Sequence, residues 1–223
     1  MNPRLLVSTS LLCLALALPV SGFAHTLYNN LESGNVATAP GGYCLGTGNC
    51  ASSYWVDAIA FTPSVTAALS DIGITLAYVS GQNSATIQLL GDSSGLPGSL
   101  IESWTVDNLF AFQGGTATPA TFVTSTSNPI LDAGQQYWVA GIAGTPGDKA
   151  NLLYWMAPQP ATFTPFATSQ DGGPYTIVPN PYVGDGGFRV DGTPVAAPEP
   201  SSLMMFGSGA LGLLGVIRRK LRS

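Results

Sequence analysis

The sequence predicts an all-β fold, an antiparallel β-sandwich of jelly-roll type, for the long middle part of the chain. Two observations predict it. Short runs of β-branched and aromatic residues recur between Gly, Pro, Asn and Asp residues, and no long amphipathic helical period is visible. Charged residues make up only 9% of the 223 residues, whereas glycines number 27 and prolines 17. This composition is common in secreted β domains, and we expect one such domain at residues 25–192.

Eight segments carry the strand pattern. Residues 74–79 and 86–89 alternate imperfectly between apolar and polar side chains, as half-buried strands do. The segment 158–181 is too rich in proline for a central strand, so we expect it at a sheet edge or in a loop. The expected strands are residues 54–61, 72–79, 85–90, 100–106, 121–124, 136–142, 152–156 and 187–191.

The first 24 residues have the pattern of a secretory signal peptide. A positive charge at Arg4 precedes the apolar run 5–20, and small residues follow at the positions that a signal peptidase reads. We expect cleavage between Ala24 and His25, with an uncleaved membrane anchor as the alternative. His25 would then be the mature N-terminus, where we expect disorder.

Most of the positive charge lies outside the expected domain. Residues 25–197 contain eleven acidic residues and two basic ones, Lys149 and Arg189, which gives a net charge of about −9. A surface with so few cations cannot replace the counterions of nucleic acid phosphates, and it should avoid anionic lipid. We therefore expect no nucleic acid partner, and positively charged partners or divalent cations fit better.

Cys44 and Cys50 are the two cysteines of the expected mature chain. In an oxidising compartment, a pair this close in sequence indicates a local disulfide that closes a small loop. The chain-entropy model gives such a short loop a stabilisation of only about 2 kcal/mol. Metal binding is the weaker alternative, because no histidine or second cysteine pair lies nearby to complete four ligands.

No motif indicates catalysis, a cofactor or a metal centre. His25 is the only histidine, so a serine hydrolase triad has little to supply its base, and a zinc site lacks a second imidazole. Scattered carboxylates could still pair as the acid and base of a glycosidase. Asp171, Asp185 and Asp191 each precede glycine and could offer oxygens to calcium, but turns explain this pattern better. We expect a protein that is not an enzyme and holds no cofactor.

Three Tyr-Trp pairs on expected strands could form a binding surface. Because neighbouring side chains of a strand face opposite sides, one ring of each pair should enter the core and one should point outward. Outward rings of Trp55, Trp138 and Trp155 could stack on sugar rings, as in a carbohydrate-binding module. The alternative that we favour is that these rings cover faces of the sheets and loops.

The C-terminal part of the chain divides into three segments. Residues 193–202 form a stalk whose prolines hold it out of any helix. Residues 203–217 carry no charge, and as a helix of roughly 23 Å they could cross a locally thinned membrane core of about 30 Å. A buried amphipathic helix is the alternative. The basic tail 218–223 predicts a cytoplasmic end. Its basic residues are Arg218, Arg219, Lys220 and Arg222.

This C-terminal part resembles the PEP-CTERM sorting signal of exported Gram-negative proteins. The resemblance rests on Pro198, Glu199 and Pro200, the hydroxyl residues after them, the glycine-rich apolar helix and the terminal arginines. It implies an exosortase-type membrane enzyme that recognises the Pro-Glu-Pro region and removes the helix. The inner membrane would be a transient anchor, and the mature protein would reach the cell surface or extracellular matrix. Such proteins often accompany exopolysaccharide production and biofilm formation, so exopolysaccharide is an expected partner.

Two segments of the expected domain resemble the choice-of-anchor R domain of bacterial surface proteins. One contains the strand 87–90 and the turn 91–98, and the other is the aromatic segment 131–139. The resemblance covers roughly residues 56–156, and it implies varied anchoring signals but no reaction. In the turn, the glycines accept positive φ and Pro97 would pre-set a bend.

These observations together predict an exported, non-catalytic surface protein. A carbohydrate-binding module delivered by the same route is the alternative. The two differ in whether tryptophan rings form an outward platform, which the arrangement of the strands decides.

Overall fold

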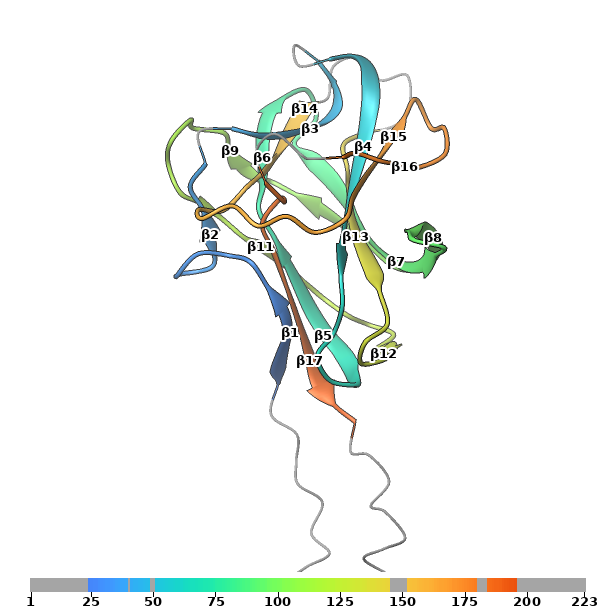
Figure 1. The fold of residues 1–223 in the computed structure, drawn as a ribbon. Helices are drawn as coiled ribbons and strands as arrows, with labels where there is room; N and C mark the ends of the chain where they lie inside the picture. The colour runs from blue at the N-terminus through green and yellow to red at the C-terminus, as the bar shows by residue number, and fades with distance from the viewer. Residues whose placement is uncertain (1–23, 40, 49–50, 145–151, 180–183, 196–223) are drawn as a thin grey trace, which may run out of the picture. The chain divides into compact units, whose positions relative to one another are not determined.

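The described part of the chain consists of strands, turns and loops, without a helix. The all-β class is therefore confirmed for these residues. The strands belong to one compact unit, Phe23–Pro194, in which the sheets are strongly curled (Figure 1). The computed structural model describes residues 24–39, 41–48, 51–144, 152–179 and 184–195.

The expected signal peptide, membrane helix and basic tail lie outside the described residues, apart from Ala24, and they stay predictions. Within the described part, no helix has the length and apolarity that a membrane crossing requires. His25 begins the strand β1 (His25–Asn29) and pairs with Gly192. The disorder expected at His25 is wrong, because backbone pairing holds this residue in a sheet.

One sheet joins the first and the last strand of the described chain. Its five strands are β1, β5 (Ala67–Ile74), β11 (Thr121–Thr124), β12 (Ile130–Leu131) and β17 (Phe188–Pro194). The order is β1-β17-β5-β11, and β12 pairs with another part of β5. Every pair is antiparallel, and β1, β17 and β5 run side by side in Figure 1.

The second sheet has ten strands. They are β3 (Gly42–Gly48), β4 (Ala51–Phe61), β6 (Leu76–Ser80), β7 (Ser84–Ser93), β8 (Leu96–Asp107), β9 (Phe110–Ala111), β13 (Tyr137–Ile142), β14 (Leu152–Met156), β15 (Phe166–Gln170) and β16 (Thr176–Ile177). The order is β8-β7-β13-β4-β3-β14-β6-β9, and β15 pairs with β4 and with β16. The pair β6–β9 is parallel. A separate antiparallel pair consists of β2 (Val36–Ala37) and β10 (Thr118–Pro119).

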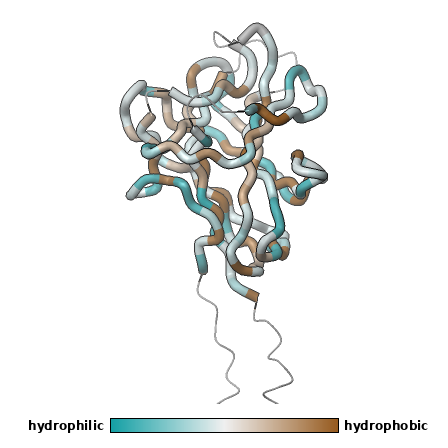
Figure 2. The backbone as a smooth tube through the Cα atoms, in the orientation of Figure 1, coloured by the Kyte–Doolittle hydropathy of each residue, from teal (hydrophilic) through white to brown (hydrophobic). Residues whose placement is uncertain are grey.

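The two large sheets share one hydrophobic core. Ile72 and Phe188 from the five-stranded sheet are fully buried in the same cluster as Ile59, Ile87 and Trp155 from the ten-stranded sheet. Figure 2 shows apolar residues interspersed with polar ones along the chain, in place of long apolar runs. This is the pattern of β layers that each turn one face toward a common core.

Most of the expected strands are confirmed. Residues 121–124 and 152–156 are β11 and β14 with the same limits. The other expected strands, apart from 72–79, fall mainly within β4, β7, β8, β13 and β17. The proline-rich segment 158–181 contributes β15, which has only the two-residue β16 on its outer side, as expected of an edge.

The expected strand 72–79 is wrong, because it is two strands in different sheets. β5 ends at Ile74 and β6 begins at Leu76, so the chain passes between the sheets at Thr75. The Thr75 side chain is fully buried, and its hydroxyl lies 2.8 Å from the carbonyl oxygen of Met156 and 3.0 Å from that of Gly187. These contacts hold the corner. Hydrophobic periodicity does not reveal this corner, because the residues on both sides of Thr75 are buried and the two strands look like one.

The turn expected at 91–98 is a tighter hairpin. Ser94 and Gly95 have φ values of 56° and 81° and join β7 to β8, as in a two-residue turn of the primed type. Pro97 lies on β8 and does not form the bend, which corrects the expectation. Because β8 is an edge strand, the missing N–H of proline is tolerated there.

The strand β3 is not predicted by the sequence, because its glycines indicate a loop. Its Gly42 packs so closely against the backbone of Trp155 on β14 that a Cβ at this position would clash with the carbonyl oxygen of Trp155. This glycine therefore allows two strands to approach closely, and it does not form a turn.

Candidate functional site

The three tryptophans of the expected sugar-binding surface do not gather on the surface. Trp138 and Trp155 are both 0% exposed, whereas Trp55 is half-buried. The outward stacking role of Trp138 and Trp155 is therefore wrong. Tyr137 and Trp138 do lie in different clusters on the two faces of their strand, but both faces are covered at this point of the sheet.

Trp138 packs on the face of the ten-stranded sheet that is turned away from the main core. Small side chains there, including Ala58, Ala140 and Ala167, make room for its ring. The indole Nε1–H donates a hydrogen bond of 2.9 Å to Oδ1 of Asp92, and the Gln136 amide donates one of 2.8 Å to the same oxygen. Trp138 thus stabilises the fold and has no free ring face to offer a ligand.

Asp92 also receives the backbone N–H of Gly95 on Oδ2, at 3.0 Å. Burial alone would raise the pKa of Asp92, but the hydrogen bonds from Gly95, Trp138 and Gln136 outweigh it and leave the pKa below its ordinary value. The aspartate of the hairpin motif is therefore an ionised structural acceptor.

Trp155 lies in the main core. Its indole N–H donates to the carbonyl oxygen of Gly187 at 3.0 Å, and its ring meets Phe188 edge-on at 6.1 Å. Gly186 lies against the ring face, where a Cβ would clash. Both faces of this ring are engaged in packing, which explains why it cannot serve as a platform.

The three Asp-Gly positions are separate in the fold. Asp171 lies in a turn at φ 52°, and its carboxylate accepts the N–H of Tyr54 at 2.9 Å, which ties the turn to the strand β4. Asp191 binds Thr26 at 2.8 Å and lies 2.7 Å from Nε of Arg189, and Asp185 is fully buried. Among the residues that the structure describes, no three His, Cys, Asp or Glu side chains come together in a way that could hold a metal ion.

Cys44 lies on β3 and is half-buried opposite Tyr154 of β14. Its expected partner, Cys50, lies outside the described residues. The disulfide between them stays a prediction, and residues 44–48 of the loop that it would close belong to the strand β3.

A polar cluster that the sequence does not predict surrounds Asp185. Oδ2 of Asp185 accepts the backbone N–H of Thr164 at 2.7 Å, and its own N–H donates to the carbonyl oxygen of Thr162 at 2.7 Å. Asn30 donates to the Thr162 hydroxyl at 3.1 Å and accepts the N–H of Phe188 at 2.8 Å. Oδ1 of Asp185 accepts no hydrogen bond within the described residues.

Burial raises the pKa of Asp185 to about 6, although hydrogen bonds from Thr164 and Thr162 oppose the rise. Burial, followed by the nearby charge of Asp185, raises the pKa of Tyr28 to about 12. A carboxyl group with this pKa could carry a proton near neutral pH. A glycosidase mechanism would need a second carboxylate beside it, and the hydrogen-bonding partners of Asp185 are threonines.

A cavity of about 250 Å³ opens beside Tyr28, Phe61 and Thr164. Two of its polar side chains bond to the protein: the Thr164 hydroxyl donates to the carbonyl oxygen of Ala60 at 3.0 Å, and Gln136 donates to Asp92. The remaining wall is mainly apolar. This cavity offers a ligand shape but few free hydrogen-bonding groups.

Two further carboxyl groups have raised pKa values for structural reasons. Asp57, only 3% exposed on β4, has a pKa well above its ordinary value because burial disfavours the charged form. Asp71 faces Asp191 across β5 and β17, and burial together with the charge of Asp191 raises its pKa. Neither group lines a described cavity with a second functional side chain.

Comparison with known protein families identifies the C-terminal part of the chain. Residues 196–220 match the PEP-CTERM protein-sorting motif, which confirms the interpretation of Pro198, Glu199 and Pro200 as part of a sorting signal. The motif implies processing by an exosortase-type enzyme and export to the cell surface. No curated protein matches the chain. The resemblance of residues 56–156 to the choice-of-anchor R domain stays a prediction.

Proposed function

We propose that this chain is a non-catalytic surface protein of a Gram-negative bacterium that associates with exopolysaccharide in the biofilm matrix. The observation that carries the proposal is the sorting motif at residues 196–220, because it sets both the route and the destination. The exported part is then a strongly acidic β-sandwich, which we take to be of jelly-roll type.

The proposed maturation has two cuts. Signal peptidase would cleave between Ala24 and His25, and the exosortase-type enzyme would cleave near Pro198–Pro200 while residues 203–217 hold the chain transiently in the inner membrane. The limits of the folded part support this order, because β1 begins at His25 and β17 ends at Pro194. Both cuts would leave every described strand intact. Passage through an oxidising compartment would also permit the disulfide between Cys44 and Cys50.

The proposed absence of catalysis is supported by the distribution of the carboxyl groups. Asp185, Asp57 and Asp71 have raised pKa values, yet they belong to separate networks of hydrogen bonds and strands. Asp92 and Glu102 have lowered pKa values and act as acceptors for backbone and side-chain donors. A hydrolase needs such groups to converge on one substrate position.

The charge of the exported part favours a neutral polymer. A net charge of about −9 over residues 25–197 would repel acidic polysaccharide and has no effect on uncharged sugar chains. A carbohydrate-binding module delivered by the same route is the second candidate. What favours it is an exposed aromatic ring at Phe110, since two of the three tryptophans that first suggested it, Trp138 and Trp155, are buried.

The mature C-terminus tests the sorting proposal. Mass spectrometry of protein released from the cell surface should find chains that end near residues 198–202 and lack the apolar helix. Glu199→Ala should leave the helix attached and the protein with the membrane fraction. Asp107→Ala, which removes an exposed carboxylate from the folded domain, is the matched control and should be processed normally. Recovery of wild-type surface protein that still carries residues 203–217 would refute the maturation scheme.

A further inference from the structure

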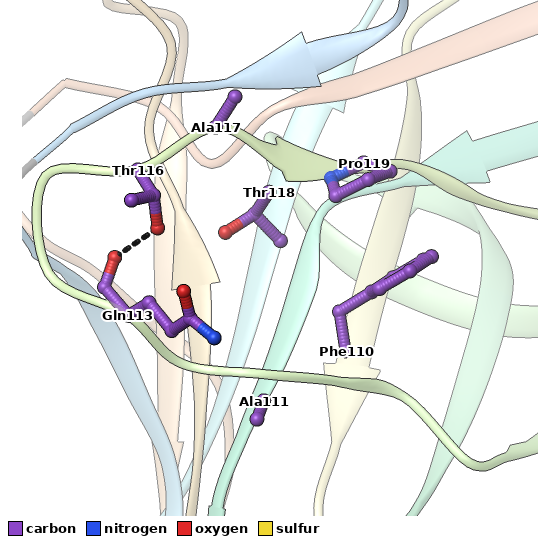
Figure 3. Close-up of a pocket in the computed structure, with 7 residues that line it drawn as sticks. All are labelled: Phe110, Ala111, Gln113, Thr116, Ala117, Thr118 and Pro119. Carbon is purple, nitrogen blue, oxygen red and sulfur yellow. Dashed lines mark hydrogen bonds between the residues drawn. The ribbon is translucent and has the colours of Figure 1, made fainter.

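A second cavity, of about 280 Å³, lies where β9, the loop after it and β10 meet (Figure 3). β9 is held by parallel pairing to β6, and β10 by antiparallel pairing to β2. The loop between them closes on itself, because the N–H of Thr116 donates to the carbonyl oxygen of Gln113 at 3.0 Å. Two anchored strands and a closed turn therefore fix the cavity wall.

An aromatic ring forms one side of this cavity. Phe110 is 51% exposed, although it sits on a strand beside the main sheet. In Figure 3 its ring lies next to Pro119, and the side chains of Gln113 and Thr118 border the same space. An exposed aromatic surface in a concave site is energetically unfavourable in water and becomes favourable when a ligand covers it.

The polar groups of the cavity are available to a ligand. The Thr118 residue is only 4% exposed, and its hydroxyl makes no hydrogen bond to the described residues. Its oxygen is not among the buried side-chain atoms that lack a partner, so the hydroxyl reaches the solvent of the cavity and can bond a ligand there. The Gln113 side chain is exposed and can both donate and accept through its amide. In the cavity beside Tyr28, by contrast, Thr164 and Gln136 bond to protein groups.

The chemistry of the lining selects a neutral ligand. None of the seven lining residues is charged, so the cavity offers no charged partner to a phosphate, a carboxylate or an ammonium group. A flat aromatic face, a hydroxyl and an amide around a space of this size match a six-membered sugar ring, which has apolar C–H faces and hydroxyl edges. Because Phe110 and Gln113 lie at the surface, a sugar within a polymer could also enter.

We propose that this cavity binds one neutral pyranose unit, with its ring stacked on Phe110 and its hydroxyls bonded to Thr118 and Gln113. The site rests on the proposed function in one respect only, namely that matrix exopolysaccharide would supply the sugar. Phe110 acts as the stacking face, and Thr118 and Gln113 set the orientation. None of these three residues was expected from the sequence to bind a ligand.

Binding can be measured on the purified full chain in a sugar-free detergent. The free sugars to test are glucose, galactose, mannose and N-acetylglucosamine, and saturation-transfer NMR at millimolar concentrations detects their binding. Neutral polysaccharides are tested by casting them into native gels. Phe110→Ala should weaken binding roughly tenfold or more, and Thr118→Val several-fold. Phe110→Trp should retain it. Phe163→Ala, which removes another exposed phenylalanine (63% exposed) that does not line this cavity, is the control and should bind as wild type.

Each outcome bears on the site. Binding of polymer and free sugar, both lost in Phe110→Ala but not in Phe163→Ala, supports a single-pyranose subsite. Absence of binding to every neutral probe by the wild-type chain, or equal binding by the two alanine variants, overturns it. Thermal melting of each variant shows whether the fold is kept. Phe110→Trp keeps an aromatic ring at this position, so retained binding in this variant shows that the loss in Phe110→Ala comes from the missing ring and not from lower stability. Correct sorting without sugar binding would reject the site alone, whereas sugar binding without processing at Pro198–Pro200 would reject the sorting scheme alone.

Discussion

Glu102 and Asp185 are both almost inaccessible to solvent, at 9% and 0% exposure, yet their pKa values move in opposite directions. Glu102 lies on β8 beneath the loop that follows β11. Asp185 lies just before β17, beside Thr162 and Thr164. The pKa of Glu102 is lowered from 4.5 to about 2, and that of Asp185 is raised from 3.8 to about 6.

The balance between burial and hydrogen-bond donors explains the difference. Oε2 of Glu102 accepts the hydroxyls of Ser125 at 2.6 Å and Ser127 at 2.8 Å, and Oε1 accepts the N–H of Thr126 at 2.7 Å, its hydroxyl at 3.0 Å and the N–H of Ser127 at 3.3 Å. Burial raises both pKa values, but in Glu102 these donors outweigh it. The Asp185 carboxyl group lies deeper and has fewer close donors: Oδ2 accepts the N–H of Thr164, the hydroxyls of Thr162 and Thr164 add weaker support, and Oδ1 accepts no hydrogen bond within the described residues. Donors and depth together decide which carboxyl group keeps its charge.

Removing the Glu102 carboxylate should have the largest effect on stability. In Glu102→Ala the hydroxyls and amides of residues 125–127 lose their common acceptor, and we expect the free energy of unfolding to fall by about 3 kcal/mol near neutral pH. Urea denaturation of the mature protein measures this. Asp107→Ala, on the same strand but exposed, should change it by less than about 0.5 kcal/mol.

The acid side provides an independent check on Glu102. Because its folded pKa is depressed, the stability that it contributes is complete above about pH 4.5 and is lost as the pH falls through about 2. Glu102→Gln should remove this part of the acid dependence. Equal losses in Glu102→Ala and Asp107→Ala would show that the loop contacts contribute nothing.

The second largest effect should be a change in pH dependence at Asp185. Its raised pKa means that the folded state holds the proton more tightly, so stability is greatest below about pH 3.8 and decreases as the pH rises through about 6, by at most about 3 kcal/mol. Asp185→Asn keeps an acceptor for the N–H of Thr164 and cannot ionise. Its melting temperature should therefore exceed that of the wild type near pH 8 and converge with it near pH 4. Parallel curves for the two proteins would contradict the assigned charge state.

The smallest effect should come from a single donor in the Glu102 network. Ser127→Ala removes one of the hydroxyls on Oε2, and we expect a loss of about 1 kcal/mol. A double-mutant cycle with Glu102→Ala checks the assignment, because the loss should nearly disappear once the carboxylate is absent. An undiminished loss in that background would place the contribution of Ser127 elsewhere.

Several parts of the fold were open to prediction because their signals are local. The limits of residues 121–124 and 152–156 follow from runs of β-branched and aromatic residues between breakers. The corner at Thr75 was missed because its two strands form one apolar run, and the sheets to which they belong are set by distant partners. Pro97 was expected in a bend because proline is accepted in a strand only where that strand lies at the edge of a sheet. Whether a strand lies at the edge depends on the strand order, which the sequence does not show.

The candidate site was less predictable for the same reason. Outward rings at Trp138 and Trp155 were one of two hypotheses, because strand alternation assigns side chains to faces but does not say what packs against each face. Phe110 and Thr118 are separated by a turn and are joined to different strands, β6 and β2, so their common cavity has no signature in the chain. The exposure of Phe110 and the position of the Thr118 hydroxyl beside it are properties that coordinates alone reveal.

The sequence by itself determined the sorting signal, the acidic balance of the exported part and the all-β class, since each depends on composition or on residues adjacent in the chain. Tertiary structure decided which carboxyl groups stay charged, which aromatic rings remain available and where a neutral ligand could bind. Those properties depend on contacts such as Glu102 with residues 125–127 and Asp185 with Thr164. Charge and exposure are set by the neighbours that folding brings together, and residues far apart in the chain supply most of them.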